Sequence, residues 1–168
     1  MRTAVFLLIG SMGLAQAPSL DGLTGFKTKA ELDAIVAKFQ SGELNRAQLL
    51  FGRDHGAYHA GINRISGRHI AEMHMNKDEF FVVLAGSATM TVGGTLTDAK
   101  PRSALDPSEV RGVAITGGKS QKISAGDVIS VPFGTPHEIN PGNGEIVYIC
   151  VTMFGQLPPV KKPSVDQK

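Results

Sequence analysis

The sequence has a single cysteine, Cys150, no tryptophan, and almost balanced charges. One cysteine excludes both an intramolecular disulfide and an all-cysteine metal site. The formal net charge of +2 gives no support to a basic face, so we expect no nucleic-acid partner. After the N-terminal segment, no stretch approaches the roughly 20 apolar residues of a membrane-spanning helix, so we expect no membrane contact once that segment is removed.

Residues 1–17 have the pattern of a secretory signal. Arg2 precedes a short apolar run, and the small-x-small triplet that ends at Ala17 is typical of a cleavage site. We therefore expect a signal peptide at 1–17, cleaved after Ala17, and a secreted or periplasmic protein. The alternative is a short anchor that is not cleaved.

Twenty glycines and nine prolines among 168 residues favour many short strands joined by tight turns, which indicates one all-β domain. One helix is expected at 29–40, because Thr28 and Glu31 have the spacing of a capping box and apolar residues follow at helical intervals. This helix and a first edge strand at 49–51 belong to a segment, 18–56, that we expect to pack on the outside of the domain. Residues 155–168 are expected to form a flexible tail.

From residue 57 to 154, apolar and polar residues alternate in short runs between glycine turns, as they do in half-buried strands. Strands are expected at 58–65, 69–75, 80–84, 88–92, 113–116, 121–123, 128–131 and 145–153. About eight strands without intervening helices predict a double-sheet jelly roll or another closed β-barrel. The polar stretch 93–112 is interpreted as a long loop, and Glu138 and Glu145 as solvated strand residues.

Two segments contain side chains that bind metal ions. Glu72 and His74 lie two apart on a predicted strand, so their side chains share one face. A turn at 76–78 then allows Glu79 to return towards His74, and His137 follows a turn-rich segment at the start of another strand. Imidazoles and carboxylates on facing strands are suitable ligands for a divalent ion such as non-haem iron.

The same segments resemble the paired motifs of the cupin superfamily. The first motif matches from His74 through Glu79 to Gly86, and the second at four positions, which are Gly126, Pro132, Gly134 and His137. The resemblance implies a double-stranded β-helix, or jelly-roll barrel, preceded here by one N-terminal helix. It also implies that His74, Glu79 and His137 are metal ligands.

The sequence departs from the cupin pattern at three places. Glu72 stands where the first histidine of the first motif is usual, the leading glycine is one residue closer, and Asn140 comes one residue early. With Glu72 as a ligand, the set has two histidines and two carboxylates. That set suits Mn, Fe, Zn or Ni, with Mn or Fe favoured because carboxylates are hard ligands. Glu72 or Glu79 could also leave the metal and act as a catalytic base.

Residues near the start of the alternating region are candidates for contact with a substrate. On the predicted strand at 58–65, one face carries His59 and Asn63, and the opposite face carries Tyr58 and Arg64. Alternation alone does not decide which face lies inside the barrel. An inward Arg64 would form a clamp for an anionic ligand.

Two classes of function fit this sequence. The first is an exported enzyme of the oxygenase, isomerase or lyase type, which acts on a small oxygen-rich molecule at a divalent metal inside the barrel. The second is a cupin that binds a sugar or an acid without turnover. The resemblance further implies a homodimer, and the run 146–151 is apolar on both faces, as an interface or a buried position would require.

Overall fold

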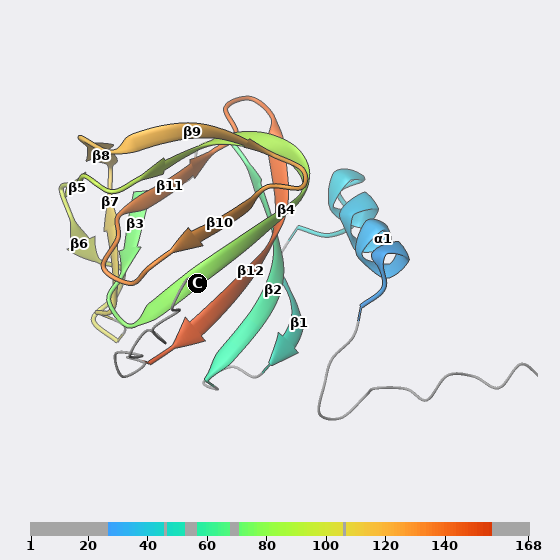
Figure 1. Cartoon of the computed structure of the whole chain (residues 1–168), viewed down its shortest axis with the longest axis horizontal. Helices are drawn as coiled ribbons and strands as arrows, with labels where there is room; N and C mark the ends of the chain where they lie inside the picture. The colour runs from blue at the N-terminus through green and yellow to red at the C-terminus, as the bar shows by residue number, and fades with distance from the viewer. Residues whose placement is uncertain (1–26, 46, 53–56, 68–70, 106, 156–168) are drawn as a thin grey trace, which may run out of the picture.

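The computed structural model describes residues 27–45, 47–52, 57–67, 71–105 and 107–155 (Figure 1). The expected signal peptide at 1–17 lies outside these residues, as does the expected tail except for its first residue. Within the described part of the chain, no helix has the length and apolarity needed to cross a membrane.

The described residues form one helix and a series of antiparallel strands (Figure 1). Their bounds are α1 (Lys29–Gln40), β1 (Gln48–Gly52), β2 (Tyr58–Ser66), β3 (Ala71–His74), β4 (Lys77–Val92), β5 (Thr95–Thr97), β6 (Lys100–Pro101), β7 (Glu109–Gly112), β8 (Ala114–Thr116), β9 (Lys119–Ser124), β10 (Val128–Val131), β11 (His137–Asn140) and β12 (Glu145–Phe154). The helix begins and ends where the sequence predicts, and the capping box of Thr28 and Glu31 is present.

Ten strands form a continuous sheet that rolls into a jelly-roll barrel, so the predicted all-β fold with one N-terminal helix is confirmed. Sheet A consists of β1, β2, β12, β10 and the first half of β4. Sheet B consists of β9, β11, β3, β7, β6 and the second half of β4. Strand β1 lies at one edge, as expected for residues 49–51.

Strand β4 belongs to both sheets, although the sequence predicts two separate strands at 80–84 and 88–92. Its first half pairs with β12 and β10, and its second half pairs with β9 and β11. Gly86 lies at the change of partners with a φ of 75°. A Cβ atom there would collide with the carbonyl oxygen of Glu145, so only glycine fits this corner of the barrel.

The interpretation of 93–112 as a long loop is wrong. The stretch contains β5, β6 and β7, which pair with β8, β7 and β3 respectively. These strands are short and polar, so they lack the apolar alternation that marks a half-buried strand. Strand β7 extends sheet B and brings Glu109 and Arg111 to the barrel interior.

Two apolar clusters stabilise the barrel. The inner cluster lies inside the barrel and includes Phe81, Met90 and the buried Cys150. The outer cluster joins α1 to sheet A through Phe39, which is 1% exposed, and through Val147. Burying a phenylalanine contributes about 2 kcal/mol. The helix α1 thus packs against Val147, one of the outward-facing residues of 146–151, and the expected homodimer stays a prediction.

Candidate metal centre

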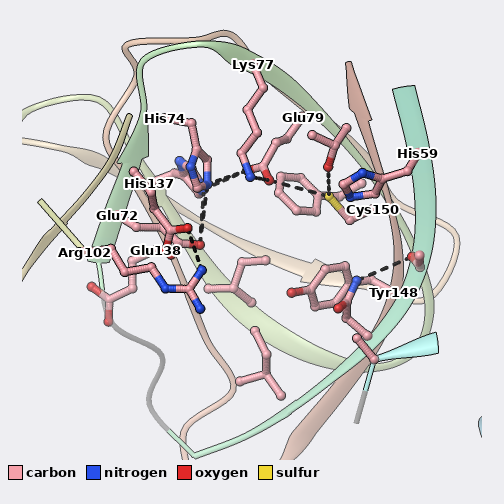
Figure 2. Close-up of a pocket in the computed structure, with 18 of the residues that line it drawn as sticks. His59, Glu72, His74, Lys77, Glu79, Arg102, His137, Glu138, Tyr148 and Cys150 are labelled. Carbon is pink, nitrogen blue, oxygen red and sulfur yellow. Dashed lines mark hydrogen bonds and ion pairs between the residues drawn. The ribbon is translucent and has the colours of Figure 1, made fainter. Parts of the chain in front are cut away.

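Four side chains converge inside the open half of the barrel (Figure 2). Ligand atoms of Glu72, His74 and His137 all lie within 4.8 Å of one another, a possible metal-binding triad. Oε2 of Glu79 lies 3.4 Å from Nε2 of His74 and 3.1 Å from Nε2 of His137. The structure therefore brings together all four residues that the sequence predicts as ligands.

Strand register explains this convergence. His137 on β11 lies opposite Glu72 on β3 in the antiparallel ladder, and His74 follows two residues later on the same face of β3. The chain then turns at 75–76, one residue earlier than expected, and β4 brings Glu79 back into the interior. The turn before His137 is tied to this region because the Gly134 amide donates to the His74 carbonyl at 2.6 Å.

The orientation of His137 is suited to metal binding. Its Nδ1 lies 3.1 Å from the carbonyl oxygen of Thr135, which can only accept, so Nδ1 carries the proton and Nε2 faces the centre. Within the described residues, Nε2 of His137 and Oε2 of Glu79 are buried and have no well-aligned hydrogen-bond partner. Buried polar atoms without partners are rare, and a cation between them would satisfy both. The donor set therefore fits a divalent ion.

Charges within the centre oppose the effect of burial. Burial acts to raise the pKa of Glu79, but His137, His74 and Lys77 outweigh it and lower that pKa. Burial likewise acts to lower the pKa of His137, but Glu79 and smaller contributions from Thr135 and Glu72 raise it. Without a metal, the two side chains therefore favour an ionised pair, and a metal ion would replace the proton on His137.

A network of arginines and glutamates continues the centre along sheet B. One carboxylate oxygen of Glu72 faces both histidines at 3.8 and 3.9 Å, and the other lies 3.5 Å from Arg111. Arg111 also pairs with Glu109 at 2.7 Å, and Arg102 pairs with Glu109 at 2.8 Å. The sequence analysis missed this network because it assigned 93–112 to a loop. The only signal in the sequence was that Glu109 and Arg111 lie two residues apart, as two side chains on the same face of a strand do.

The cavity above the centre has a volume of about 470 Å³, and the residues that line it show which face of β2 points into the barrel. His59 and Asn63 line it, whereas Tyr58 is 50% exposed and Arg64 pairs with Glu145 at 2.7 Å. Neither Tyr58 nor Arg64 is one of the described residues that line the cavity. The inward face is therefore that of His59, and the arrangement gives Tyr58 and Arg64 no contact with the cavity.

The expectation that Glu138 and Glu145 are solvated is wrong. Glu138 on β11 is 7% exposed and lines the cavity. Glu145 is partly buried, and its carboxylate forms the ion pair with Arg64. Strand alternation did not reveal these positions because the burial of a charged residue depends on its partners.

Cys150 lies in the cavity wall, with Sγ 3.7 Å from Oε1 of Glu79 and 3.6 Å from Oγ1 of Thr152. Burial, together with the nearby charge of Glu79, raises the pKa of its thiol to about 12. The thiol is therefore protonated at neutral pH, which makes it a poor nucleophile and a poor metal ligand.

No family model and no curated protein match the chain. Similar solved structures include a Bacillus halodurans protein that is 19% identical to this chain. The match covers 82% of this chain and 87% of that chain, with a TM-score of 0.49. A Cupin 2 conserved barrel domain protein from Salinispora arenicola is 17% identical. The match covers 64% of this chain and 74% of that chain, with a TM-score of 0.42. A predicted oxalate decarboxylase from Thermotoga maritima is 18% identical. The match covers 64% of this chain and 78% of that chain, with a TM-score of 0.44.

The chain is thus similar to structures named as cupins, the family that its two motifs resemble. The fold and site described above rest on the strand pairing and side-chain positions of the chain itself. On that basis it is a jelly-roll barrel with a candidate metal centre in its interior.

Proposed function

We propose that the protein is an exported metal-dependent enzyme that acts on a small oxygen-rich molecule inside the barrel, by oxygenase, isomerase or lyase chemistry. His74, His137, Glu79 and Glu72 would hold the ion, with Mn or Fe favoured over Zn or Ni because half of the ligands are carboxylates. One observation carries the proposal: two imidazoles and two carboxylates meet in a cavity where, among the described residues, Nε2 of His137 and Oε2 of Glu79 are buried with no well-aligned hydrogen-bond partner.

A divalent ion at this position supplies Lewis-acid or oxygen-activating chemistry. The residues of the chain supply the rest. Thr135 fixes the ring of His137, and Arg111 holds one oxygen of Glu72 while the other faces the centre. Glu72 is therefore the candidate base, because its inward oxygen could leave the ion and accept a proton from a ligand in the cavity.

A second candidate is a binding protein without turnover. The observation that favours it is the pairing of the carboxylates near the centre. Glu109 pairs with two arginines, and Glu72 pairs with one of them, so the charges that a base would use are partly neutralised. In this case the ligand would be a small sugar or acid.

Metal analysis tests the centre. Protein purified without an affinity tag is equilibrated with Mn, Fe, Zn or Ni, and the bound ion is measured by mass spectrometry. We expect about one ion per chain in the wild type and its loss in both His74→Ala and His137→Ala. The Glu145→Gln variant, which changes a carboxylate outside the cavity lining, is the control and should retain the ion. Full metal content in the double histidine variant would contradict the site.

Turnover separates the two candidates. The metal-loaded protein is incubated with small acids and sugars, and consumption is followed by NMR and oxygen uptake. An enzyme consumes one of them, and Glu72→Gln reduces the rate while the ligand still binds. If an acid or sugar binds saturably but is not consumed, either in air or without oxygen, the result favours a binding protein without turnover.

We also propose export and a homodimer. Export is supported by the signal pattern at 1–17, and the dimer by the family resemblance. Expression of the full chain with N-terminal sequencing of the exported product should give Pro18 as the first residue. Light scattering of the same product should give twice the mass of one mature chain.

A further inference from the structure

One wall of the cavity contains donors that the metal centre does not use. Lys77 begins β4 and His59 lies near the start of β2, and both side chains contact the ring of Phe154 on β12. The Lys77 ammonium is 6.0 Å from the Phe154 ring centroid, and the His59 ring centroid is 5.4 Å from it. Figure 2 shows Lys77, Glu79 and His59 along the sheet A side of the cavity.

These donors have little to bind in the protein itself. The Lys77 side chain is 19% exposed, and its nearest anion, Oε1 of Glu79, is 3.7 Å away, which is too long for a hydrogen bond. Nδ1 of His59 is buried and has no hydrogen-bond partner within the described residues. Burial of a polar atom without a partner costs free energy, so Nδ1 of His59 is placed for a partner from outside the chain. The half-buried Lys77 has only the long ion pair with Glu79, so its ammonium can donate to the same partner.

The charge of the cavity lining favours an anion once the centre contains its metal. The lining has three cationic side chains and four carboxylates, which are Lys77, Arg102, Arg111, Glu72, Glu79, Glu109 and Glu138. With neutral histidines this lining has a net charge of minus one, and a divalent ion changes it to plus one. Glu79 as a metal ligand would share its charge with the ion, which leaves the ammonium of Lys77 to a bound anion.

We propose that Lys77 and His59 form a carboxylate subsite beside the metal, and that the ligand of this protein is a small carboxylic acid with a second oxygen that faces the metal. The proposal deepens the proposed function and rests on its metal centre. The Lys77 ammonium and a protonated Nδ1 of His59 donate to the carboxylate. Lys77 then acts as a specificity residue, because it distinguishes an acid from a neutral molecule of the same shape.

Matched acids and amides test the subsite. The probes are glycolate and glycolamide, lactate and lactamide, and malonate and malonamide, titrated by calorimetry into the full chain at saturating Zn or Mn. We expect at least one acid to bind wild type about tenfold or more tighter than its amide, a difference of about 1.4 kcal/mol. We expect this preference to disappear in Lys77→Met and to decrease in His59→Phe. The control Lys122→Met, on the exposed strand β9, should keep it.

The acid-to-amide ratio distinguishes a specific role from a structural one. A variant that only disturbs the fold weakens both members of a pair equally, which would overturn the subsite. Binding of none of the acids to metal-loaded wild type, or an unchanged preference in Lys77→Met, would also overturn it. Failure of the metal centre is seen separately, because wild-type protein would then contain no ion before any acid is added.

Discussion

His137 on β11 lies directly opposite Glu72 on β3, and Nε2 of His137 is 3.9 Å from Oε1 of Glu72. The two residues are 65 positions apart in the chain, and a single cross-strand register brings them together. Strand geometry therefore places Glu72 at a candidate ligand position, although the motif that the sequence resembles has a histidine there. The chemistry of this pair distinguishes the centre from a three-histidine site.

Replacing Glu72 by histidine should shift the metal preference from Mn towards Zn. The change removes a hard carboxylate and adds an imidazole, which Zn prefers. We expect the ratio of bound Zn to bound Mn to rise about tenfold, or ~1.4 kcal/mol, when the protein is equilibrated with equal amounts of both. Glu145→His, outside the cavity lining, is the control. An unchanged ratio would show that Glu72 is not a ligand.

Gly86→Ala should destabilise the barrel strongly. The residue has positive φ, and a Cβ atom there meets the Glu145 carbonyl. Gly142 has a φ of 62° with no atom within 4 Å of an added Cβ, so Gly142→Ala isolates the backbone strain. We expect a loss of about 1 kcal/mol for Gly142→Ala and at least ~2 kcal/mol for Gly86→Ala in urea unfolding. Equal losses would mean that β4 does not bend tightly at Gly86.

The thiol of Cys150 should react with a disulfide reagent only after unfolding. Its pKa of about 12 leaves almost no thiolate at about pH 8, and the side chain is buried. We expect labelling within minutes in concentrated urea and at least about 100-fold slower labelling of the native protein. Rapid native labelling, with unfolding excluded by circular dichroism, would contradict the placement of Cys150 in the barrel wall.

The capping box of α1 should remain charged in strong acid. The backbone hydrogen bond from Thr28 is the largest cause that lowers the pKa of Glu31, from 4.5 to about 2. Because the folded pKa is lowered, its contribution to stability is complete above the unfolded value of 4.5 and is lost as the pH falls through about 2. An NMR titration should give a Glu31 midpoint near 2 in wild type and a higher one in Thr28→Ala. A wild-type midpoint near 4.5 would show that the capping box does not persist in solution.

Local patterns in the sequence predict the local parts of this structure. Thr28 and Glu31 define the start of α1 through contacts three residues apart, and Glu72 and His74 share a face because strand side chains alternate. The motif from His74 to Glu79 spans one short turn, so the position of Glu79 relative to His74 also depends on residues that are close in the sequence. Such features require no knowledge of which strands pair.

Other features of the candidate site were not accessible in this way. The sequence left open whether His59 or Tyr58 faces inwards, and it assigned Glu109 and Arg111 to a loop. His59 faces the cavity because β2 pairs with β12 in one register, which places Thr152 opposite His59. Arg111 reaches Glu72 because β7 pairs with β3, a contact between polar strands that no hydrophobic pattern marks.

The sequence by itself determined the all-β class, the N-terminal helix, and the two imidazoles and two carboxylates that can bind a metal, because these follow from composition and from spacings of a few residues. Only the tertiary structure decided which side chains share the cavity with them. A shift of one residue in strand register moves every side chain to the opposite face, so the placement of Lys77, His59 and Arg111 depends on pairings between distant strands.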